Sequence, residues 1–212
     1  MDPKKEYYKK IASTIIDNLK LRRMEGHYCE TSKDALDLVM SMIPAGQQVS
    51  FGGSVTLTET GILEALRARE DITLYDRSTC TTPEEIQAVY RQAFSCDTYL
   101  MSTNAITIQG ELINIDGNAN RVAALCYGPD QVILVVGVNK IVTDVESGYK
   151  RVKDIASPQN GIRLERNSPC AITGKCGECW GDACMCSQTV VTRRSTVVDR
   201  IKVILVGENL GY

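Results

Sequence analysis

Hydrophobic and charged positions alternate with a helical period over the first part of the chain. Apolar residues recur three or four positions apart between residues 4 and 24, and Gly26 follows as a typical signal for a helix end. A second run of the same kind begins at Ser32, a residue favoured at helix N-caps, and stops at Pro44. The pattern therefore predicts an N-terminal segment of helices over residues 1–45.

From residue 47 onward, short β-type runs alternate with amphipathic helical runs. The pattern predicts strands over residues 47–51, 72–75, 98–101, 131–136 and 201–206. Helices are predicted over residues 56–69, 83–94, 120–127 and 144–155, and a hairpin over 105–115. Strands separated by helices indicate an α/β fold with an open, mostly parallel sheet covered by helices on both faces. We expect one such domain over residues 1–212.

Residues 157–194 interrupt this alternation, because they show little apolar periodicity. We interpret them as a cysteine-rich insertion between the last predicted helix and the last predicted strand. Such a segment lacks the apolar side chains of a core of its own, so something else must hold it in place.

The overall charge is close to neutral, with 24 Lys and Arg residues against 26 Asp and Glu residues. This balance argues against binding to nucleic acid or to a membrane surface. No apolar run approaches the roughly 20 residues that a membrane-spanning helix needs, and the charged first ten residues do not resemble a signal peptide. We therefore expect a cytoplasmic protein.

A glycine-containing loop joins the predicted strand 47–51 to the helix that follows it. Gly52, Gly53, Ser54 and Thr56 could bind a ligand there, because open α/β sheets bind ligands at the carboxyl ends of their strands. The alternative is a tight turn with a threonine cap. Glu59, in the first turn of the helix, is a candidate catalytic carboxylate or an ordinary surface residue that compensates the helix dipole.

The densest polar sequence lies in the middle of the chain, also at the ends of predicted strands. Asn104, Asn118 and Asn120 are candidate ligand-binding residues, and Asp116 is a candidate catalytic carboxylate within a turn sequence. Arg121 could form a structural salt bridge with Asp116, or it could bind a carboxylate or phosphate of a ligand and act in catalysis.

Asn139 and Lys140 follow the buried strand 131–136 and are expected at the same edge of the sheet. Lys140 could contact an anion or be an ordinary solvated lysine. Polar groups on several loops at one edge favour a binding site for a small anionic ligand. Since His27 is the only histidine and falls in a loop, acid–base chemistry would need Asp116, Glu59 or a cofactor.

Five of the 9 cysteines fall within residues 170–186, with the spacing Cys-x5-Cys-x2-Cys-x4-Cys-x-Cys. Thiols stay reduced in the cytoplasm, so this spacing predicts a metal site rather than disulfides. Zinc and an iron–sulfur cluster both accept four thiolates, and the spacing does not choose between them. Cys184 and Cys186 compete for the fourth position.

Together these motifs resemble the LUD (lactate-utilisation) domain family, in its short, cysteine-tailed form. The resemblance rests on Gly52-Gly53-Ser54-Val55-Thr56, Ser102 to Thr107, Asn114 to Ala124, Val136 to Lys140, Pro169-Cys170, the later cysteines, and Glu208 to Gly211. It implies a fold like that of the sugar-phosphate isomerase and CoA-transferase superfamily. It also implies an association with the oxidation of L-lactate to pyruvate, beside iron–sulfur protein partners.

The chain departs from the family pattern at two positions. Ala119 stands where the family usually has glycine, so the local turn is expected to differ. Cys184 stands where the family usually has arginine. The resemblance therefore implies Cys186 as the fourth metal ligand. It completes the set begun by Cys170, Cys176 and Cys179.

Three functional hypotheses follow. The first is a redox component acting on a small 2-hydroxy or 2-oxo acid, with Arg121 and Lys140 holding the carboxylate and an iron–sulfur cluster at the cysteines. The second is a non-redox ligand-binding or isomerase-like protein with structural zinc and a phosphorylated or CoA-type ligand. The third is a regulatory subunit without chemistry. We place the first hypothesis ahead of the second. The sequence leaves open whether the chain forms a homo-oligomer.

Overall fold

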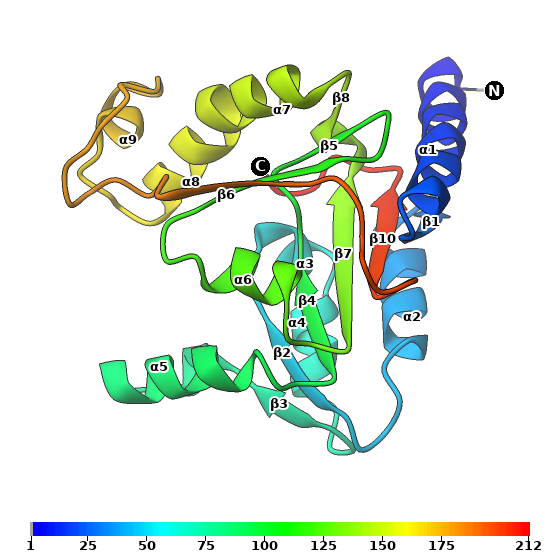
Figure 1. Cartoon of the computed structure of the whole chain (residues 1–212), viewed down its shortest axis with the longest axis horizontal. Coiled ribbons are helices and arrows are strands. Elements are labelled where there is room, and N and C mark those ends of the chain that lie inside the picture. Colours follow the sequence, from blue (N-terminus) through cyan, green and yellow to red (C-terminus); the bar gives the residue numbers. More distant parts are fainter. Residues whose placement is uncertain (1) are drawn as a thin grey trace.

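Six parallel strands form the centre of the molecule in this computed structural model, which describes residues 2–212. The sheet has the order β1-β10-β7-β4-β2-β3 (Figure 1). The strands are β1 (Glu25–Cys29), β10 (Ile201–Val206), β7 (Gln131–Gly137), β4 (Thr98–Met101), β2 (Gln48–Phe51) and β3 (Thr73–Tyr75). The predicted α/β fold with a parallel sheet is confirmed.

The central strand β7 shows why the sheet forms here. Its sequence is a continuous β-branched and apolar run, typical of a strand that is buried on both faces. Val132, Leu134 and Val136 belong to one hydrophobic core, whereas Ile133 and Val135 belong to another. Successive side chains of a strand point to opposite faces, so one strand supplies both cores.

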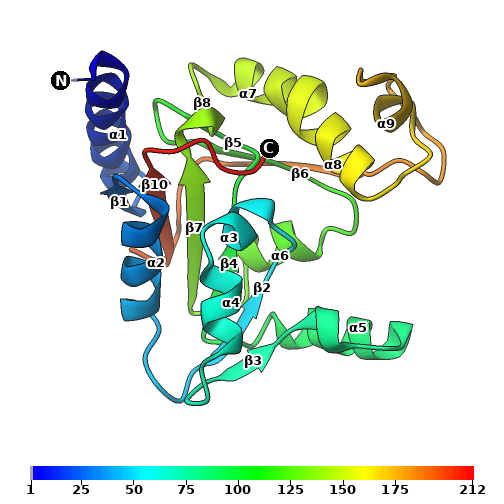
Figure 2. The ribbon, with the colours of Figure 1, turned by 180° about the vertical axis from the view of Figure 1, so that it is seen from behind.

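Helices cover both faces of the sheet, as the sequence predicts (Figures 1 and 2). α1 (Pro3–Leu21) packs into the first core, and α6 (Asn120–Cys126) contributes to the same core. On the opposite face lie α2 (Ser32–Ser41), α3 (Val55–Glu59) and α4 (Ile62–Arg67). α5 (Pro83–Gln92) has no buried residue and projects from the body. No helix among residues 2–212 is long and apolar enough to cross a membrane.

A second, four-stranded sheet lies across the carboxyl ends of the first (Figure 1). Its order is β8-β5-β6-β9, with β8 (Ile141–Val142), β5 (Ala105–Thr107), β6 (Leu112–Asp116) and β9 (Gln188–Thr192). The predicted hairpin over 105–115 is the β5–β6 pair of this sheet. The sheet packs against α7 (Val145–Arg151) through a small core of its own.

The N-terminal segment differs from the prediction, because it contains a strand as well as helices. α1 ends at Leu21, and Gly26 lies inside β1, which pairs with β10 in parallel. A side chain at Gly26 would come within 3.0 Å of side-chain atoms of Ile16 and Leu19. Close packing against α1, and not a helix end, therefore explains this glycine.

Two predicted helices also have different bounds. The helix predicted over 56–69 is divided into α3 and α4 by Gly61, whose φ of 74° is left-handed. The helix predicted over 144–155 continues through a π-helical turn (Val152–Ala156) into α8 (Ser157–Arg163). The predicted insertion 157–194 therefore contains α8, the short α9 (Pro169–Thr173) and β9.

Ala119 adopts a left-handed backbone conformation, of the kind that favours glycine. It lies directly before α6 with φ 63° and ψ −5°, a left-handed conformation that alanine adopts only at an energetic cost. The turn is held by Asp116, whose Oδ1 accepts hydrogen bonds from the backbone N–H groups of Asn118 and Ala119 at 3.2 Å each. The difference expected in the local turn stays a prediction.

We expect Ala119→Gly to stabilise the protein by about 0.5–1 kcal/mol. Glycine removes the cost of the left-handed conformation, and the larger conformational entropy of glycine in the unfolded chain offsets part of this gain. Thermal and urea unfolding measure the change. Ala123→Gly, in the middle of α6, serves as the control and should destabilise the protein by about 1 kcal/mol. Equal destabilisation by both variants would contradict the strain at position 119.

Candidate functional site

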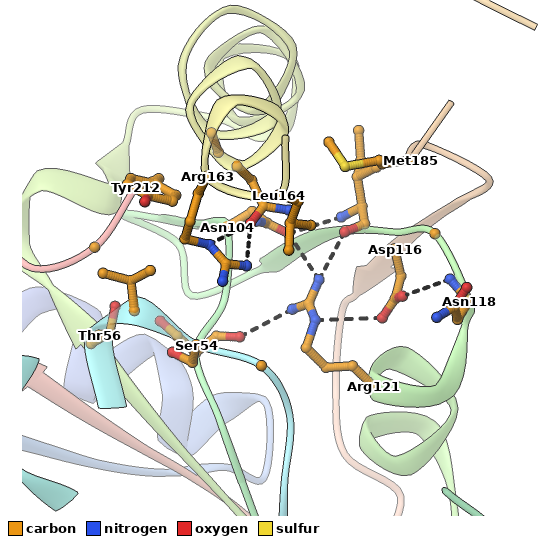
Figure 3. Close-up of a pocket in the computed structure, with 18 of the residues that line it drawn as sticks. Ser54, Thr56, Asn104, Asp116, Asn118, Arg121, Arg163, Leu164, Met185 and Tyr212 are labelled. Atoms are coloured by element: carbon orange, nitrogen blue, oxygen red, sulfur yellow. Dashed lines mark hydrogen bonds and ion pairs between the residues drawn. The ribbon is translucent and has the colours of Figure 1, made fainter. Parts of the chain in front are cut away.

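A polar pocket of about 360 Å³ lies at the carboxyl edge of the parallel sheet (Figure 3). Residues 53–56 follow β2, residues 102–104 follow β4, and Lys140 follows β7, so three neighbouring strands contribute to it. This is the edge at which open α/β sheets bind ligands. Residues 115–118 and 120–121, at the end of β6 and the start of α6, form a further wall.

Most of the residues selected from the sequence line this pocket. They are Gly53, Ser54, Thr56, Asn104, Asp116, Asn118, Asn120, Arg121 and Lys140. Gly52, Glu59, Asn139 and the cysteines 170, 176, 179 and 186 do not line it, whereas Cys184 does. The fold thus brings together loops that lie far apart in the sequence.

Arg121 occupies the buried side of the pocket and is surrounded by protein acceptors. Its Nη1 donates to the Ser102 carbonyl at 3.1 Å and to Asn114 Oδ1 at 2.6 Å. Its Nη2 donates to Asn104 Oδ1 at 3.1 Å and to the Ile115 carbonyl at 2.8 Å. Its Nε lies 3.4 Å from an oxygen of Asp116. Of the two roles open from the sequence, this arrangement corresponds to the structural one.

Asp116 is likewise committed to the protein. Besides the two backbone N–H groups that Oδ1 accepts, its Oδ2 accepts from Val122 N at 3.3 Å and lies beside Arg121. The carboxylate therefore caps the start of α6 and balances the buried guanidinium. A catalytic role for Asp116 would require these contacts to break.

Lys140 is a buried cation of the pocket and lacks a carboxylate partner among the described residues. Its side chain is 4% exposed, and Nζ donates to Thr56 Oγ1 at 2.8 Å and to Ser102 Oγ at 3.0 Å. Burial, together with the charges of Arg151 and Arg121, lowers the pKa of Lys140 to about 7. Lys140 is therefore not an ordinary solvated lysine.

Three further arginines line the pocket, and the sequence did not indicate any of them. They are Arg77, Arg163 and Arg166. Arg77 follows β3, so the rule about strand ends would have found it. Arg163 and Arg166 lie at and beyond the end of α8, in the segment expected to be an insertion. Asn160 and Arg163 of this helix line the pocket together with Leu164, which directly follows it; Figure 3 shows Arg163 and Leu164. No local pattern indicated that helix.

Apart from the cysteines, three selected residues lie outside the pocket and contact the segments around it. Glu59 accepts a hydrogen bond from Gly211 N at 2.7 Å, and Asn139 bonds to the backbone of Leu210 and Gly211. They hold the C-terminal tail, whose last residues line the pocket. Gly52 packs closely, since a side chain there would come within 3.1 Å of Arg121.

The cysteine segment forms part of the pocket wall through Asp182, Cys184 and Met185. Within it, burial raises the pKa of the Cys179 thiol, and the neighbouring Cys184 raises this pKa further. Cys186 instead donates to Ser157 Oγ at 3.4 Å on α8. Cys184 is thus a neighbour of Cys179, whereas Cys186 contacts α8, and the choice of the fourth metal ligand stays a prediction.

The segment does not form a complete ligand set in this arrangement. Among residues 2–212, no three Cys, His, Asp or Glu side chains are placed so that they could hold one metal ion. Cys170 is buried, and its Sγ lies 3.4 Å from Ser168 Oγ. The donor chemistry suits a soft metal, and the thiols would have to move closer together to bind one.

Comparison with known proteins supports one family. A family model described as the LUD domain matches residues 12–206. A crystal structure of a DUF162 family protein from Deinococcus radiodurans is similar with a TM-score of 0.55 and 14% identity, over 94% of this chain and 98% of that chain. At this level of sequence identity, the similarity shows a common fold and nothing about function.

A partial similarity also exists to ribose 5-phosphate isomerase A from Neisseria gonorrhoeae. It has a TM-score of 0.35 and 10% identity, over 54% of each chain. Among curated proteins, none matches the sequence.

The buried lysine predicts a specific pH dependence of stability. Its pKa in the folded protein is about 7, below its ordinary value of 10.5, so between these values the unfolded chain binds more protons. The stability of the wild type relative to Lys140→Met should therefore rise by up to a few kcal/mol as the pH increases from about 7 to about 10. Urea unfolding at several pH values measures it.

Lys150→Met is the matched control, because Lys150 is exposed on α7. Its stability difference from the wild type should not rise over this interval. A Lys140→Met difference that is flat or falls with pH would contradict a lowered pKa for Lys140.

Proposed function

The chain belongs to the LUD domain family, and from the chemistry of its pocket we propose that it binds a small organic anion there. One observation carries the proposal. Lys140, Arg77, Arg163 and Arg166 surround a pocket in which the remaining basic group, Arg121, is already neutralised by Asp116. Only Asp182 opposes these four cations among the described residues that line the pocket.

Several features of the cations support binding of a carboxylate or phosphate. Arg166 has no side-chain hydrogen bond or ion pair within residues 2–212. Arg163 bonds to Asn160, a neutral amide, and Arg77 to the Tyr90 hydroxyl. Each arginine therefore keeps donors for a ligand, and guanidinium groups suit planar or tetrahedral anions. A volume of about 360 Å³ suits a small metabolite.

Among small organic anions, we favour a 2-hydroxy or 2-oxo acid, because the resemblance to the LUD domain family implies an association with the oxidation of lactate. A phosphorylated or CoA-type ligand is the alternative. Lactate, pyruvate and inorganic phosphate are the probes that separate these ligand classes. Any hydroxyl group of a bound acid would lie among the amides of Asn104, Asn118 and Asn120, which line the same pocket.

A second candidate is thiolate metal binding at the cysteine segment, and it is supported by the effect of Cys184 on Cys179, whose pKa this neighbour raises in addition to burial. Clustered thiols raise one another's pKa, and a bound cation would relieve that repulsion. The segment would have to close further around the metal. An iron–sulfur cluster would supply redox chemistry and suit iron–sulfur protein partners, whereas zinc would be structural.

We expect Arg163→Gln combined with Arg166→Gln to weaken the binding of the preferred probe by roughly 10- to 100-fold, because charge-assisted hydrogen bonds are lost. Isothermal titration calorimetry with lactate, pyruvate and phosphate measures it. Arg194→Gln is the matched control, since this exposed arginine does not line the pocket, and its affinity should stay unchanged. Absence of binding for all three probes in the wild type would refute the proposed function.

For the second candidate, protein purified without oxygen should contain bound metal, and Cys179→Ser should lose it. Iron with stoichiometric sulfide supports the redox form, and zinc alone supports the structural form. Elemental analysis and a visible spectrum distinguish them, with Cys126→Ser, outside the segment, as the control. A metal-free wild type with intact thiols would eliminate this candidate.

A further inference from the structure

Lys140 has an unusual set of hydrogen-bond partners for a lysine in an anion-binding pocket. It lies at the end of a 3-10 turn (Val138–Lys140) that directly follows β7, so the backbone fixes its place. Its two Nζ partners are neutral hydroxyls, those of Thr56 and Ser102. Three arginines, Arg77, Arg163 and Arg166, remain to meet the charge of an anion when this amine is unprotonated, so its neutral form is available for another task.

The directions of the hydrogen bonds determine where the amine can react. Ser102 Oγ donates to the Val135 carbonyl at 2.6 Å, and Thr56 Oγ1 donates to the Leu210 carbonyl at 3.3 Å. Each hydroxyl has a single proton, so both can only accept from Nζ. A neutral amine has two N–H groups and one lone pair. With both N–H groups so used, the lone pair occupies the remaining tetrahedral position.

The surroundings also favour the neutral form of this amine. Arg151 and Arg121 are its cationic neighbours, and Glu59 is the one acidic group that raises its pKa. Arg151 itself is held by the carbonyls of Asn139 and Asn104 at 3.1 Å and 2.6 Å, so its charge stays near Lys140. With a pKa of about 7, a large share of Lys140 is unprotonated at neutral pH. An unprotonated lysine in a pocket is a nucleophile.

We propose that Lys140 forms an imine with the carbonyl carbon of a 2-oxo acid bound in the pocket. The inference rests on the proposed function, because the arginines would hold the carboxylate while the carbonyl group faces Nζ. It deepens that function, since it selects oxo acids over hydroxy acids and phosphates. Lys140 would be the residue that distinguishes a carbonyl from a hydroxyl group.

The step balances without an oxidant or reductant. Nζ attacks the carbonyl carbon, so an N–C bond forms and the carbonyl π bond opens to a carbinolamine. The carbonyl oxygen then leaves as water, taking with it the two hydrogens of the amine. An N=C double bond remains between Lys140 and the former carbonyl carbon. The Thr56 and Ser102 hydroxyls lie within hydrogen-bond distance of Nζ and orient it during the attack.

Reductive trapping tests the inference in the full-length wild-type protein. The protein is incubated with pyruvate and sodium cyanoborohydride, and the adducts are located by intact mass and peptide mapping. We expect one main adduct, on Lys140, formed at least about tenfold faster than that on exposed Lys150, because far more of Lys140 is unprotonated at neutral pH. Lactate, which carries no carbonyl group, should leave no adduct.

Two variants complete the test. Lys140→Arg should abolish the main adduct, and Arg163→Gln combined with Arg166→Gln should slow its formation without moving it to another lysine. The wild-type map is informative even where a variant does not fold. Adducts spread evenly over surface lysines would overturn the inference.

The two proposals can fail separately. If lactate, pyruvate or phosphate binds but Lys140 is not trapped, the imine is refuted and the anion site stands. If none of the three binds and none is trapped, the proposed function is refuted, and the imine with it.

Discussion

The buried guanidinium of Arg121 is the interaction on which the two sheets and the pocket depend. It donates to the Ser102 carbonyl at the end of β4 in the main sheet, and to Asn114 and the Ile115 carbonyl of β6 in the second sheet. A buried charge is costly unless it is paired and fully hydrogen-bonded, and Asp116 completes the pairing. Because these acceptors come from both sheets, satisfying this one charge fixes how the sheets lie against each other.

This arrangement separates the structural cations from the cations that are available to a ligand. Arg121 is used by the protein, and Arg151 likewise donates to backbone carbonyls of Asn104 and Asn139. The arginines at the rim of the pocket bond only to neutral groups, and Lys140 bonds only to hydroxyls. The pocket therefore keeps positive charge although the chain as a whole carries a formal net charge of −2. Local concentration of charge, not the total, determines which ligands a site attracts.

The cysteine segment illustrates a different relation between sequence and structure. Its spacing is a clear chemical signal, yet its thiols do not converge within the described chain, and one of them, Cys184, lines the anion pocket. A spacing pattern says which ligands can reach a common point, but not whether the surrounding loop holds them there. Met185 beside Cys184 is also part of that wall, so the cysteine segment contributes two adjacent residues to the pocket.

By itself, the sequence determined the α/β class, most strands of the main sheet, and nine residues of the pocket wall, because apolar periodicity and strand-end position are local properties. Tertiary structure decided what local patterns do not contain. β1 becomes a strand by pairing with β10, from the opposite end of the chain, and β9 by pairing with β6. Likewise, Arg121 could be a ligand contact or a structural cation until its acceptors were known. Local sequence cannot count them, because they lie on separate strands that only folding brings together.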